Sequence, residues 1–317
     1  MLITILRRIL YALPIALAVS LFCFALVHIA PGDPINAILP PDAPADVVDA
    51  VRKTYGLDKP LPVQFGIWLW KVLQGDLGKS LATGRDIWPD LSGALQNTLT
   101  LALAAAMIGF PIGIVLGSLA GAFRGTWIDR ACVGTAVAGV SVPHYWLGMV
   151  MVVIFSVTLN WLPSMGASQD GSGGWSLDWE HLQHLVLPAI TLSVIPMGIV
   201  TRTLRGIIGE ILGQDFITTL RGKGLRRPGV VVHVIKNAAP QALSVMGLQL
   251  GYLMGGSILV ETVFAWPGTG LLLNNAIFQR DIPVLQSTIL VLAMFFVALN
   301  LAVDMAQSLI DPRMRRA

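Results

Sequence analysis

A few residue groups in this chain have types and spacings that could support chemistry. Gly78-Lys79-Ser80 resembles the end of a phosphate-binding loop, but such a loop needs a glycine five residues earlier, where Leu73 stands. His181 and His184 could share one helix face and bind a metal. Because no carboxylate or cysteine completes that set, we expect a solvated interfacial pair instead. The sequence therefore predicts neither an ATP site nor a metal site.

Other kinds of catalytic or energy-converting residues are also not evident. The sequence has neither an HExxH zinc motif nor a GxSxG nucleophile motif. Glu261 and Asp304 fall at the ends of apolar runs, whereas a proton-driven carrier normally holds an ionisable residue deep within a span. We therefore predict a chain that is not an enzyme and binds no cofactor. If it moves a solute uphill, a partner must supply the energy.

The most informative polar segment covers residues 210–240. It carries Arg221, Lys223, Arg226 and Arg227 among turn-forming glycines, and long apolar runs flank it. A basic island between two membrane spans is typical of the cytoplasmic side. Its residues predict a docking surface for a cytoplasmic partner.

The composition places the whole chain in a membrane. Of its 317 residues, 55% are hydrophobic and only 12% are charged, against about 25% charged in soluble domains. The net charge of +3 is too small to indicate nucleic-acid binding. Cys23 and Cys132 fit no metal or redox spacing, so we expect both to pack as small apolar side chains.

Six apolar windows are long enough to span a bilayer, which needs about 20 residues. We therefore predict an all-α integral membrane protein with six transmembrane helices and a single domain over residues 1–317. A seventh, shorter window contains turn residues and two asparagines, so we interpret it as a re-entrant element. The predicted spans are 9–30, 98–123, 131–160, 184–202, 238–261 and 284–308, with an outer loop at 31–97, an inner loop at 205–237 and a re-entrant loop at 262–283.

The distribution of basic residues predicts the orientation. With the N-terminus inside, two-thirds of the 21 lysine and arginine residues fall on the inner side. Most of the remainder lie in the long first outer loop, where the rule is weak. Both termini are therefore predicted to be cytoplasmic.

Glycines spaced four apart mark one face of the second and fifth predicted spans. Such spacing lets a neighbouring helix approach closely. The neighbour could belong to the same chain or to a second, similar subunit. These predicted packing residues are Gly109, Gly113, Gly117, Gly121, Gly247, Gly251 and Gly255.

Taken in order along nearly the whole chain, several motifs resemble one family. The chain resembles the membrane subunit of bacterial ATP-binding-cassette (ABC) importers, in the branch that moves dipeptides, oligopeptides, glutathione or nickel complexes. The most specific match is ETVFAWPGTG at residues 261–270. The other matching segments are HIAPGDP at 28–34, YGLDKPL at 55–61, GDLGKS at 75–80, Ser141-Val142-Pro143, RDIPV at 280–284 and Asp311-Pro312-Arg313.

The resemblance implies a type I importer permease fold in which the inner loop bears a coupling helix that docks into the ATPase. This chain departs from the family's "EAA" pattern, because the Glu-Ala-Ala positions read Thr218-Thr219-Leu220. The basic flank and Gly224 are kept. The residues implied in ATPase coupling are Asp215, Arg221, Gly222, Lys223, Gly224, Leu225 and Arg226.

The resemblance also implies partners and a location. They are a second, homologous permease, two cytoplasmic ATPase subunits that use ATP and Mg²⁺, a periplasmic substrate-binding protein and the lipid of the bacterial inner membrane. Short peptides are the favoured cargo, with glutathione and nickel chelates as alternatives. A stand-alone secondary transporter is the alternative from another class. The residues implied in periplasmic docking or gating are Glu261, Trp266, Pro267, Gly268, Gly270, Arg280 and Asp281.

Overall fold

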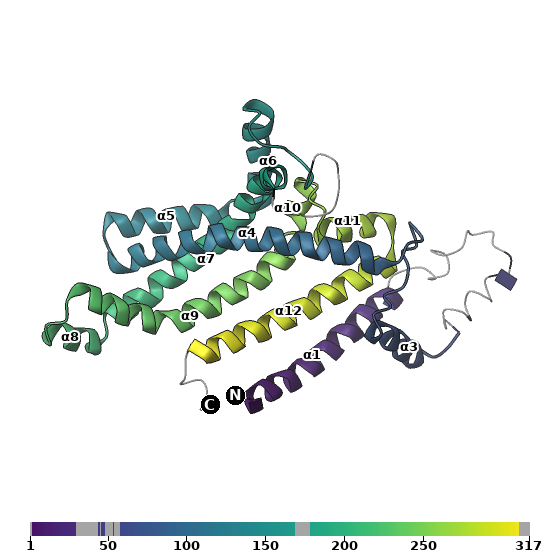
Figure 1. The fold of residues 1–317 in the computed structure, drawn as a ribbon, viewed down its shortest axis with the longest axis horizontal. Helices are drawn as coiled ribbons and strands as arrows, with labels where there is room; N and C mark the ends of the chain where they lie inside the picture. Colours follow the sequence, from purple (N-terminus) through teal and green to yellow (C-terminus); the bar gives the residue numbers. More distant parts are fainter. Residues whose placement is uncertain are drawn as a thin grey trace.

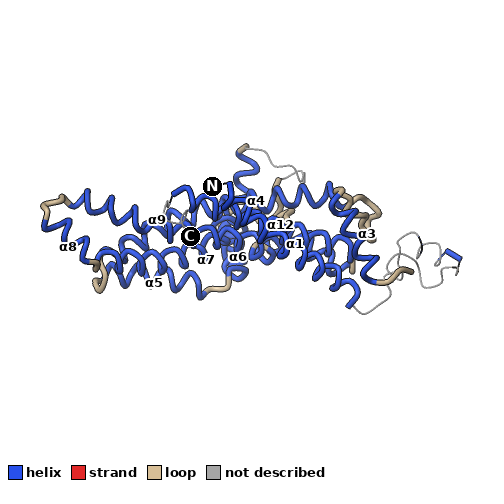
Figure 2. Tube along the Cα trace, turned by 90° about the horizontal axis from the view of Figure 1, so that it is seen from below, coloured by secondary structure: helices blue, strands red, loops and turns tan. Residues whose placement is uncertain are grey.

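The molecule is an elongated bundle of helices, seen along its length in Figures 1 and 2. The structure, a computed structural model, describes residues 2–29, 44, 46–47, 53, 58–168 and 178–310. Within these ranges there is no β-strand, only one isolated bridge between Lys79 and Asp86. The helices are α1 (Leu2–Ile29), α3 (Leu61–Leu73), α4 (Ile87–Ala122), α5 (Trp127–Ser141), α6 (His144–Met151), the π-helix η2 (Val152–Thr158), α7 (Trp179–Leu212), α8 (Asp215–Gly222), α9 (Arg227–Gly256), α10 (Ile258–Val263), α11 (Thr269–Gln279) and α12 (Ile282–Ile310).

The described helices include four that are long and apolar enough to cross a bilayer. These are α4, α7, the run from α9 through α10, and α12. A bent pair, α5 with α6–η2, makes a fifth if it counts as one span. The helices reach beyond the predicted spans, since α4 begins at Ile87 within the predicted outer loop and α7 ends at Leu212 within the predicted inner loop.

The third predicted span is not one straight helix. It turns by 93° between α5 and the α6–η2 segment, which projects from the bundle in Figure 1. Pro143 explains the break, because it disfavours the helical conformation in the preceding residue, and Val142 is extended at φ −81°, ψ 126°. The predicted span over residues 131–160 therefore consists of two helical segments joined by a sharp bend.

Glycines bring α4 and α7 into close contact. A Cβ atom on Gly109 would lie 2.7 Å from the carbonyl oxygen of Ser193, and one on Gly117 would lie 2.7 Å from that of Thr201. Gly113 and Gly121 face α7 in the same way. All four glycines of this stripe therefore pack within the chain.

We expect Gly109→Ala to destabilise the protein, because the added methyl group collides with backbone that cannot turn aside. Overpacking of this kind costs typically about 1–3 kcal/mol. Gly93→Ala is the matched control on the same helix, since its Cβ would meet no described atom within 4 Å. The midpoint of thermal unfolding in detergent should fall for Gly109→Ala and not for Gly93→Ala. Equal midpoints would contradict the close α4–α7 packing.

The fifth span uses two of its three glycines in the same way, against α12. A Cβ on Gly247 would lie 2.2 Å from Val303 Cγ1, and one on Gly251 would lie 2.3 Å from Phe296 Cε2. Gly255 differs, because none of the described atoms lies within 4 Å of its Cβ position. Helix α12 also packs along α1, so α1 and α12 form one side of the bundle (Figure 1).

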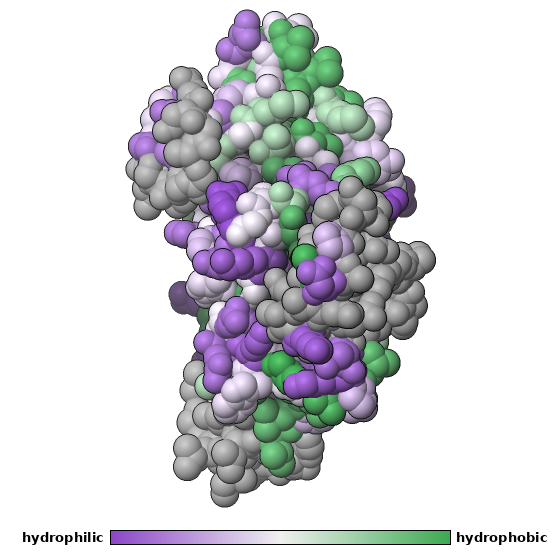
Figure 3. All heavy atoms as spheres, turned by 90° about the vertical axis from the view of Figure 1, so that its right-hand side faces the viewer, coloured by the Kyte–Doolittle hydropathy of each residue, from purple (hydrophilic) through white to green (hydrophobic). Residues whose placement is uncertain are grey.

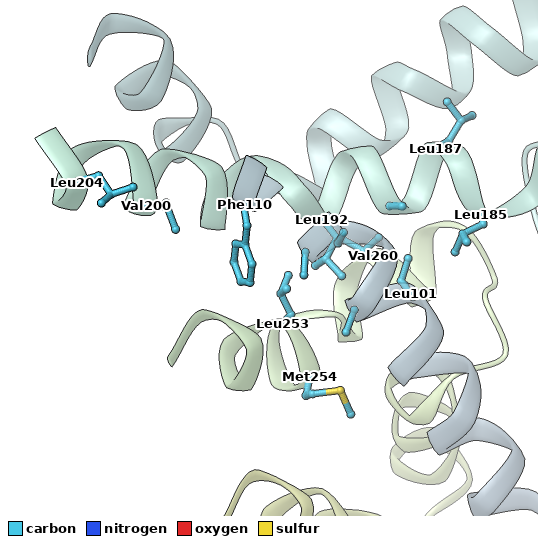
Figure 4. Packing of buried hydrophobic residues seen from close by; sticks show 14 of the residues in the cluster. Leu101, Phe110, Leu185, Leu187, Leu192, Val200, Leu204, Leu253, Met254 and Val260 are labelled. Carbon is cyan, nitrogen blue, oxygen red and sulfur yellow. The ribbon is translucent and has the colours of Figure 1, made fainter. Parts of the chain in front are cut away.

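The apolar core lies where α4, α7, α9 and α10 meet. In Figure 4, Phe110, Leu192 and Leu253 approach one another from three of these helices, and Val260 lies close by. Cys23 and Cys132 are buried free thiols, which confirms their prediction as small packing residues.

Candidate functional site

One end of the bundle carries α8 and the turn that leads into α9. The amide of Gly224 donates to the carbonyl of Arg221 at 2.9 Å, and the amide of Leu225 donates to that of Leu220 at 3.1 Å. This pair of bonds is a Schellman motif, in which the residue after the helix cap takes the left-handed conformation. Gly224 does so at φ +79°, and a glycine adopts this conformation without steric cost. The sequence thus folds into a tight turn that fixes the direction of α8.

Helix α8 has a buried face and an exposed one. Ile217 is fully buried, and Phe216 and Leu220 pack against the core from the same side. The other face is exposed and polar, with Asp215, Thr218, Thr219 and Arg221, and the basic residues Lys223 and Arg226 follow in the turn. All seven residues predicted for ATPase coupling, Asp215, Arg221, Gly222, Lys223, Gly224, Leu225 and Arg226, are exposed.

An ion pair braces this end of the bundle. The guanidinium of Arg205 on α7 donates to the carboxylate of Asp129 on α5, with Nε–Oδ1 at 2.5 Å and Nη2–Oδ2 at 2.9 Å. Asp129 is buried, and it also accepts from the amide of Gly125 in the α4–α5 turn. A bidentate arginine–carboxylate pair of this kind is a strong interaction and fixes the relative orientation of the two side chains. It joins α4, α5 and α7 just before α7 reaches α8.

We expect Asp129→Asn to weaken this brace and to lower the thermal midpoint more than the control does, because one carboxylate oxygen and the charge are lost. Asp90→Asn is the matched control, since the Asp90–Arg85 pair is exposed and such pairs contribute about 0–1 kcal/mol. Thermal unfolding of both variants checks the difference. A larger loss in Asp90→Asn would contradict the assignment.

The opposite end contains a buried corner around Glu261. Its carboxylate accepts from Thr98 Oγ1 at 2.8 Å, from the amide of Gly270 at 2.6 Å and from the amide of Leu271 at 3.3 Å. The two amides belong to the first turn of α11, where backbone donors have no partner within the helix. Glu261 therefore caps α11 from outside, in place of the side chain that Gly268 lacks at the capping position.

Two further hydrogen bonds fasten the corner to α4. The indole Nε1 of Trp266 donates to the carbonyl of Asn97 at 3.1 Å, and Asn97 Nδ2 donates to the carbonyl of Pro267 at 2.9 Å. Trp266 is fully buried. The Trp266-Pro267-Gly268 turn is thus held against α4 by two hydrogen bonds to Asn97.

Glycine is required at two points of this corner because the carboxylate of Glu261 comes close to one and the backbone of Ile258 comes close to the other. A Cβ on Gly268 would lie 2.4 Å from Glu261 Oε2, and one on Gly270 would lie 2.5 Å from the Cα of Ile258. No real Cβ contact is that short. The motif ETVFAWPGTG therefore encodes a single packed unit: the acid, the tryptophan and both glycines.

Asp281 anchors a second contact at the same end. It accepts from Ser80 Oγ at 2.5 Å and from the amides of Leu81 and Ala82, both at 3.2 Å. These bonds tie the segment before α4 to the turn before α12. The segment GDLGKS, which resembles part of a phosphate loop, therefore serves here as the partner of Asp281.

The residues predicted for periplasmic docking or gating fall into two groups. Glu261, Trp266, Gly268, Gly270 and Asp281 are buried, and Pro267 is half-buried. Arg280 is exposed and left-handed at φ +54°. The buried residues around Glu261 therefore position α11, Asp281 holds the segment before α4, and Arg280 remains exposed.

The environment of His181 and His184 differs from the one predicted from the sequence. The prediction of a solvated histidine pair was wrong, because His181 and His184 are both buried. His181 Nδ1 lies 2.7 Å from Asp178 Oδ1, and His184 Nδ1 lies 2.9 Å from the carbonyl oxygen of Met165. The part of the chain that the structure describes holds no group of three or more potential metal ligands.

Sequence reasoning missed the partners in these contacts. Thr98, Asn97, Asp129 and Arg205 were not singled out, and Ser80 was noted only within GDLGKS, because each is far along the chain from the residue it meets. Polar side chains within or beside apolar spans were the available signal, since such groups need partners. Most of HIAPGDP, the first three residues of YGLDKPL and all of Asp311-Pro312-Arg313 lie outside the described residues.

Comparison with protein families gives two matches that together cover the chain. Residues 113–316 match the family described as the binding-protein-dependent transport system inner membrane component. Residues 1–116 match the N-terminal family of the same membrane component. The first match alone covers more than half of the chain.

Individual proteins similar to this chain are also described as transport system permeases. A protein of Brucella abortus (strain 2308) described as a peptide transport system permease is 39% identical over 314 residues, covering 98% of each chain. A glutathione transport system permease protein of Salmonella choleraesuis (strain SC-B67) is 38% identical over 312 residues, again covering 98% of each.

A solved structure, the MetNI methionine ABC transporter in an inward-facing conformation, has a chain that matches 70% of this one and 96% of its own length, with a TM-score of 0.54. At 18% identity this likeness shows the fold alone. The family matches and the full-length relatives establish that this chain belongs to the family of binding-protein-dependent inner membrane components and is a permease subunit of an ABC importer.

Proposed function

We propose that this permease crosses the inner membrane six times with both termini in the cytoplasm. The spans would be α1, α4, α5 with α6–η2, α7, α9 with α10, and α12. The separation of the two ends supports this arrangement: α8 lies at one end of the bundle, and α3 and α11 lie at the other (Figures 1 and 2). Four exposed basic residues at the end of α8, in the turn and at the start of α9 support the assignment of this end to the cytoplasmic side: Arg221, Lys223, Arg226 and Arg227.

Helix α8 is the proposed coupling helix. It stands out from the bundle, its apolar face is fixed to the core, and its polar face is free to meet a partner. ATP and Mg²⁺ are used by two ATPase subunits, and this chain binds neither. Closure of the ATPases moves α8, and the Asp129–Arg205 brace carries that displacement into α5 and α7 as one rigid unit.

The opposite end is the proposed docking surface for a substrate-binding protein. Figure 3 looks onto this end, where hydrophilic side chains gather across the middle of the view. Arg280 and Phe278, which is 80% exposed, lie together at the end of α11. A second, homologous permease completes the pore as a heterodimer.

Short peptides are the proposed cargo. The names of the relatives from Brucella and Salmonella support a peptide or the tripeptide glutathione. A nickel chelate is the remaining alternative from the same branch. Membership in an ABC importer family is the reason that we do not propose a stand-alone secondary transporter.

The single observation that carries this proposal is the exposed α8, which a buried face fixes to the core and which the exposed basic residues Lys223, Arg226 and Arg227 follow. Affinity purification of the chain from its native membranes in mild detergent, followed by mass spectrometry, tests it. We expect two ATPase chains, a second permease and a binding protein, whose cargo can then be screened. Recovery of the chain alone, even after cross-linking, would contradict the proposal.

A further inference from the structure

Exposed arginines gather around the turn between α4 and α5. Residues 123–130 and 198–210 together hold four arginines and two acids, Asp129 and Glu210, which leaves an excess of two positive charges. Asp129 is already paired with Arg205. The other three arginines are exposed, and none of them forms an ion pair with a described residue. We call them the arginine patch: Arg124, Arg130 and Arg202.

The three arginines come from different elements but cluster in one place. Arg124 reaches α7, since a Cβ placed on Gly209 would lie 3.3 Å from its Nη1. Its charge also acts on Asp129, the buried acid in the first turn of α5. Arg130 follows Asp129 directly, and Arg202 lies on α7 three residues before the arginine that pairs with this acid. The arginine patch therefore gathers around the ion pair that joins α5 to α7.

The arginine patch lies at the edge of an apolar surface whose length matches a bilayer. From Leu103 to Phe123, every exposed residue of α4 and its cap is apolar. About 20 helical steps of 1.5 Å make about 30 Å, which is the thickness of the hydrocarbon core. Arg124 is the next residue along the chain, and Gln96 and Thr100 precede the other end of the stretch. The patch is therefore placed at the depth of the lipid phosphates.

Two aromatic side chains lie beside the patch at the same level. Trp127 is 76% exposed, and Phe123 is 47% exposed. Trp127 lies three residues before Arg130 on α5, so the two share one face of that helix. Tryptophan is enriched at membrane interfaces, where its ring lies among the headgroups. An exposed tryptophan next to an exposed arginine therefore indicates contact with lipid headgroups.

We propose that the arginine patch binds the phosphate of an anionic phospholipid, such as phosphatidylglycerol, in the cytoplasmic leaflet. Guanidinium groups bind phosphate through paired hydrogen bonds, and the apolar face of α4 continues from the patch as a surface for the acyl chains. A bound phosphate would link the ends of α4, α5 and α7. The inference goes beyond the proposed function and rests only on the placement of this end of the bundle at the membrane surface.

An acidic surface of the ATPase is the other kind of partner that would match the charge of the patch. The position of α8 argues against it. Helix α8 lies farther out along the molecule than the α4–α5 turn (Figures 1 and 2). A partner that docks on α8 therefore meets the basic residues after that helix before it reaches the patch.

Lipid titration of the purified complex, followed by native mass spectrometry, tests the proposal. The complex is stripped of lipid in detergent, and phosphatidylglycerol or phosphatidylcholine with the same acyl chains is then added. The test variant replaces all three residues of the arginine patch with glutamine. Arg130→Gln alone is the second variant, and it stays informative if the triple variant does not assemble. The control removes the same charge after α8, by Lys223→Gln, Arg226→Gln and Arg227→Gln.

We expect the dissociation constant for phosphatidylglycerol to rise at least about tenfold in the triple variant and about twofold or more in Arg130→Gln, because each basic residue near an anionic headgroup adds to the attraction. The control should bind phosphatidylglycerol as the wild type does, and affinity for phosphatidylcholine should be the same in all variants. Unchanged affinity of the triple variant for phosphatidylglycerol would overturn the inference. Loss of the ATPase chains from that variant, at unchanged lipid affinity, would assign the patch to the ATPase instead. The wild-type spectra show whether ATPase chains are bound at all, so the proposed function is judged separately.

Discussion

Replacement of Gly224 by valine is expected to leave the importer assembled but to uncouple it. The residue sits at φ +79° in the turn after α8, where a side chain adds about 1–2 kcal/mol of backbone strain, and a β-branched one adds more. That strain would lower the population of the correctly directed α8 by a factor of roughly 5–30. Stimulation of ATPase activity by the loaded binding protein should fall accordingly.

Asparagine at the same position is the matched control. It tolerates the left-handed conformation better than other residues with a side chain. The space around Gly224 is open, since no described atom lies within 4 Å of its Cβ position, so backbone conformation alone separates the two variants. Gly224→Asn should retain most of the stimulation. Equal activity of the valine and asparagine variants would contradict the role of this turn.

The second large effect is expected at Glu261. Glu261→Ala removes the acceptor for Thr98 and for two amides of α11, all in a site shielded from water. Each buried donor left without a partner costs about 1–3 kcal/mol, and a cavity adds to this. We expect a loss of at least about 3 kcal/mol, and a thermal midpoint lower by roughly 5 °C or more.

Three further variants make this prediction specific. Glu261→Gln keeps one accepting oxygen and should fall between the wild type and Glu261→Ala. Thr98→Val keeps the shape of the side chain and removes its hydrogen bonds, so it tests the same corner with less risk to folding. Glu210→Ala, at an exposed position on α7, should leave the midpoint unchanged. If Glu261→Ala had the same thermal midpoint as the Glu210→Ala control, the hydrogen bonds of Glu261 would not hold α11 in place.

The sequence predicts the helical class and most of the long helices because their signal is local. An apolar run of about 20 residues, or glycines spaced four apart, is visible without knowledge of the fold. The stripe from Gly109 to Gly121 could be recognised in this way, although only the structure identifies α7 as its partner.

Features that depend on distant pairs could not be predicted. The sequence suggests that Asp281 is an exposed charge that contacts a partner. In the structure Asp281 is buried and accepts a hydrogen bond from Ser80, which is 201 residues away in the sequence. The Asp129–Arg205 pair is hidden for the same reason, being 76 residues apart. The bend at Pro143 was missed because proline is common within spanning helices and does not always break them.

The central claim is that α8 meets the ATPase, and site-specific photo-cross-linking in native membranes tests it most directly. A photoreactive amino acid at Thr218, which is exposed on α8, should form an adduct with an ABC-type ATPase chain. The same group at Phe278, at the other end of the bundle, should form none with that chain. Cross-linking of the ATPase from Phe278 and not from Thr218 would contradict both the docking site and the orientation.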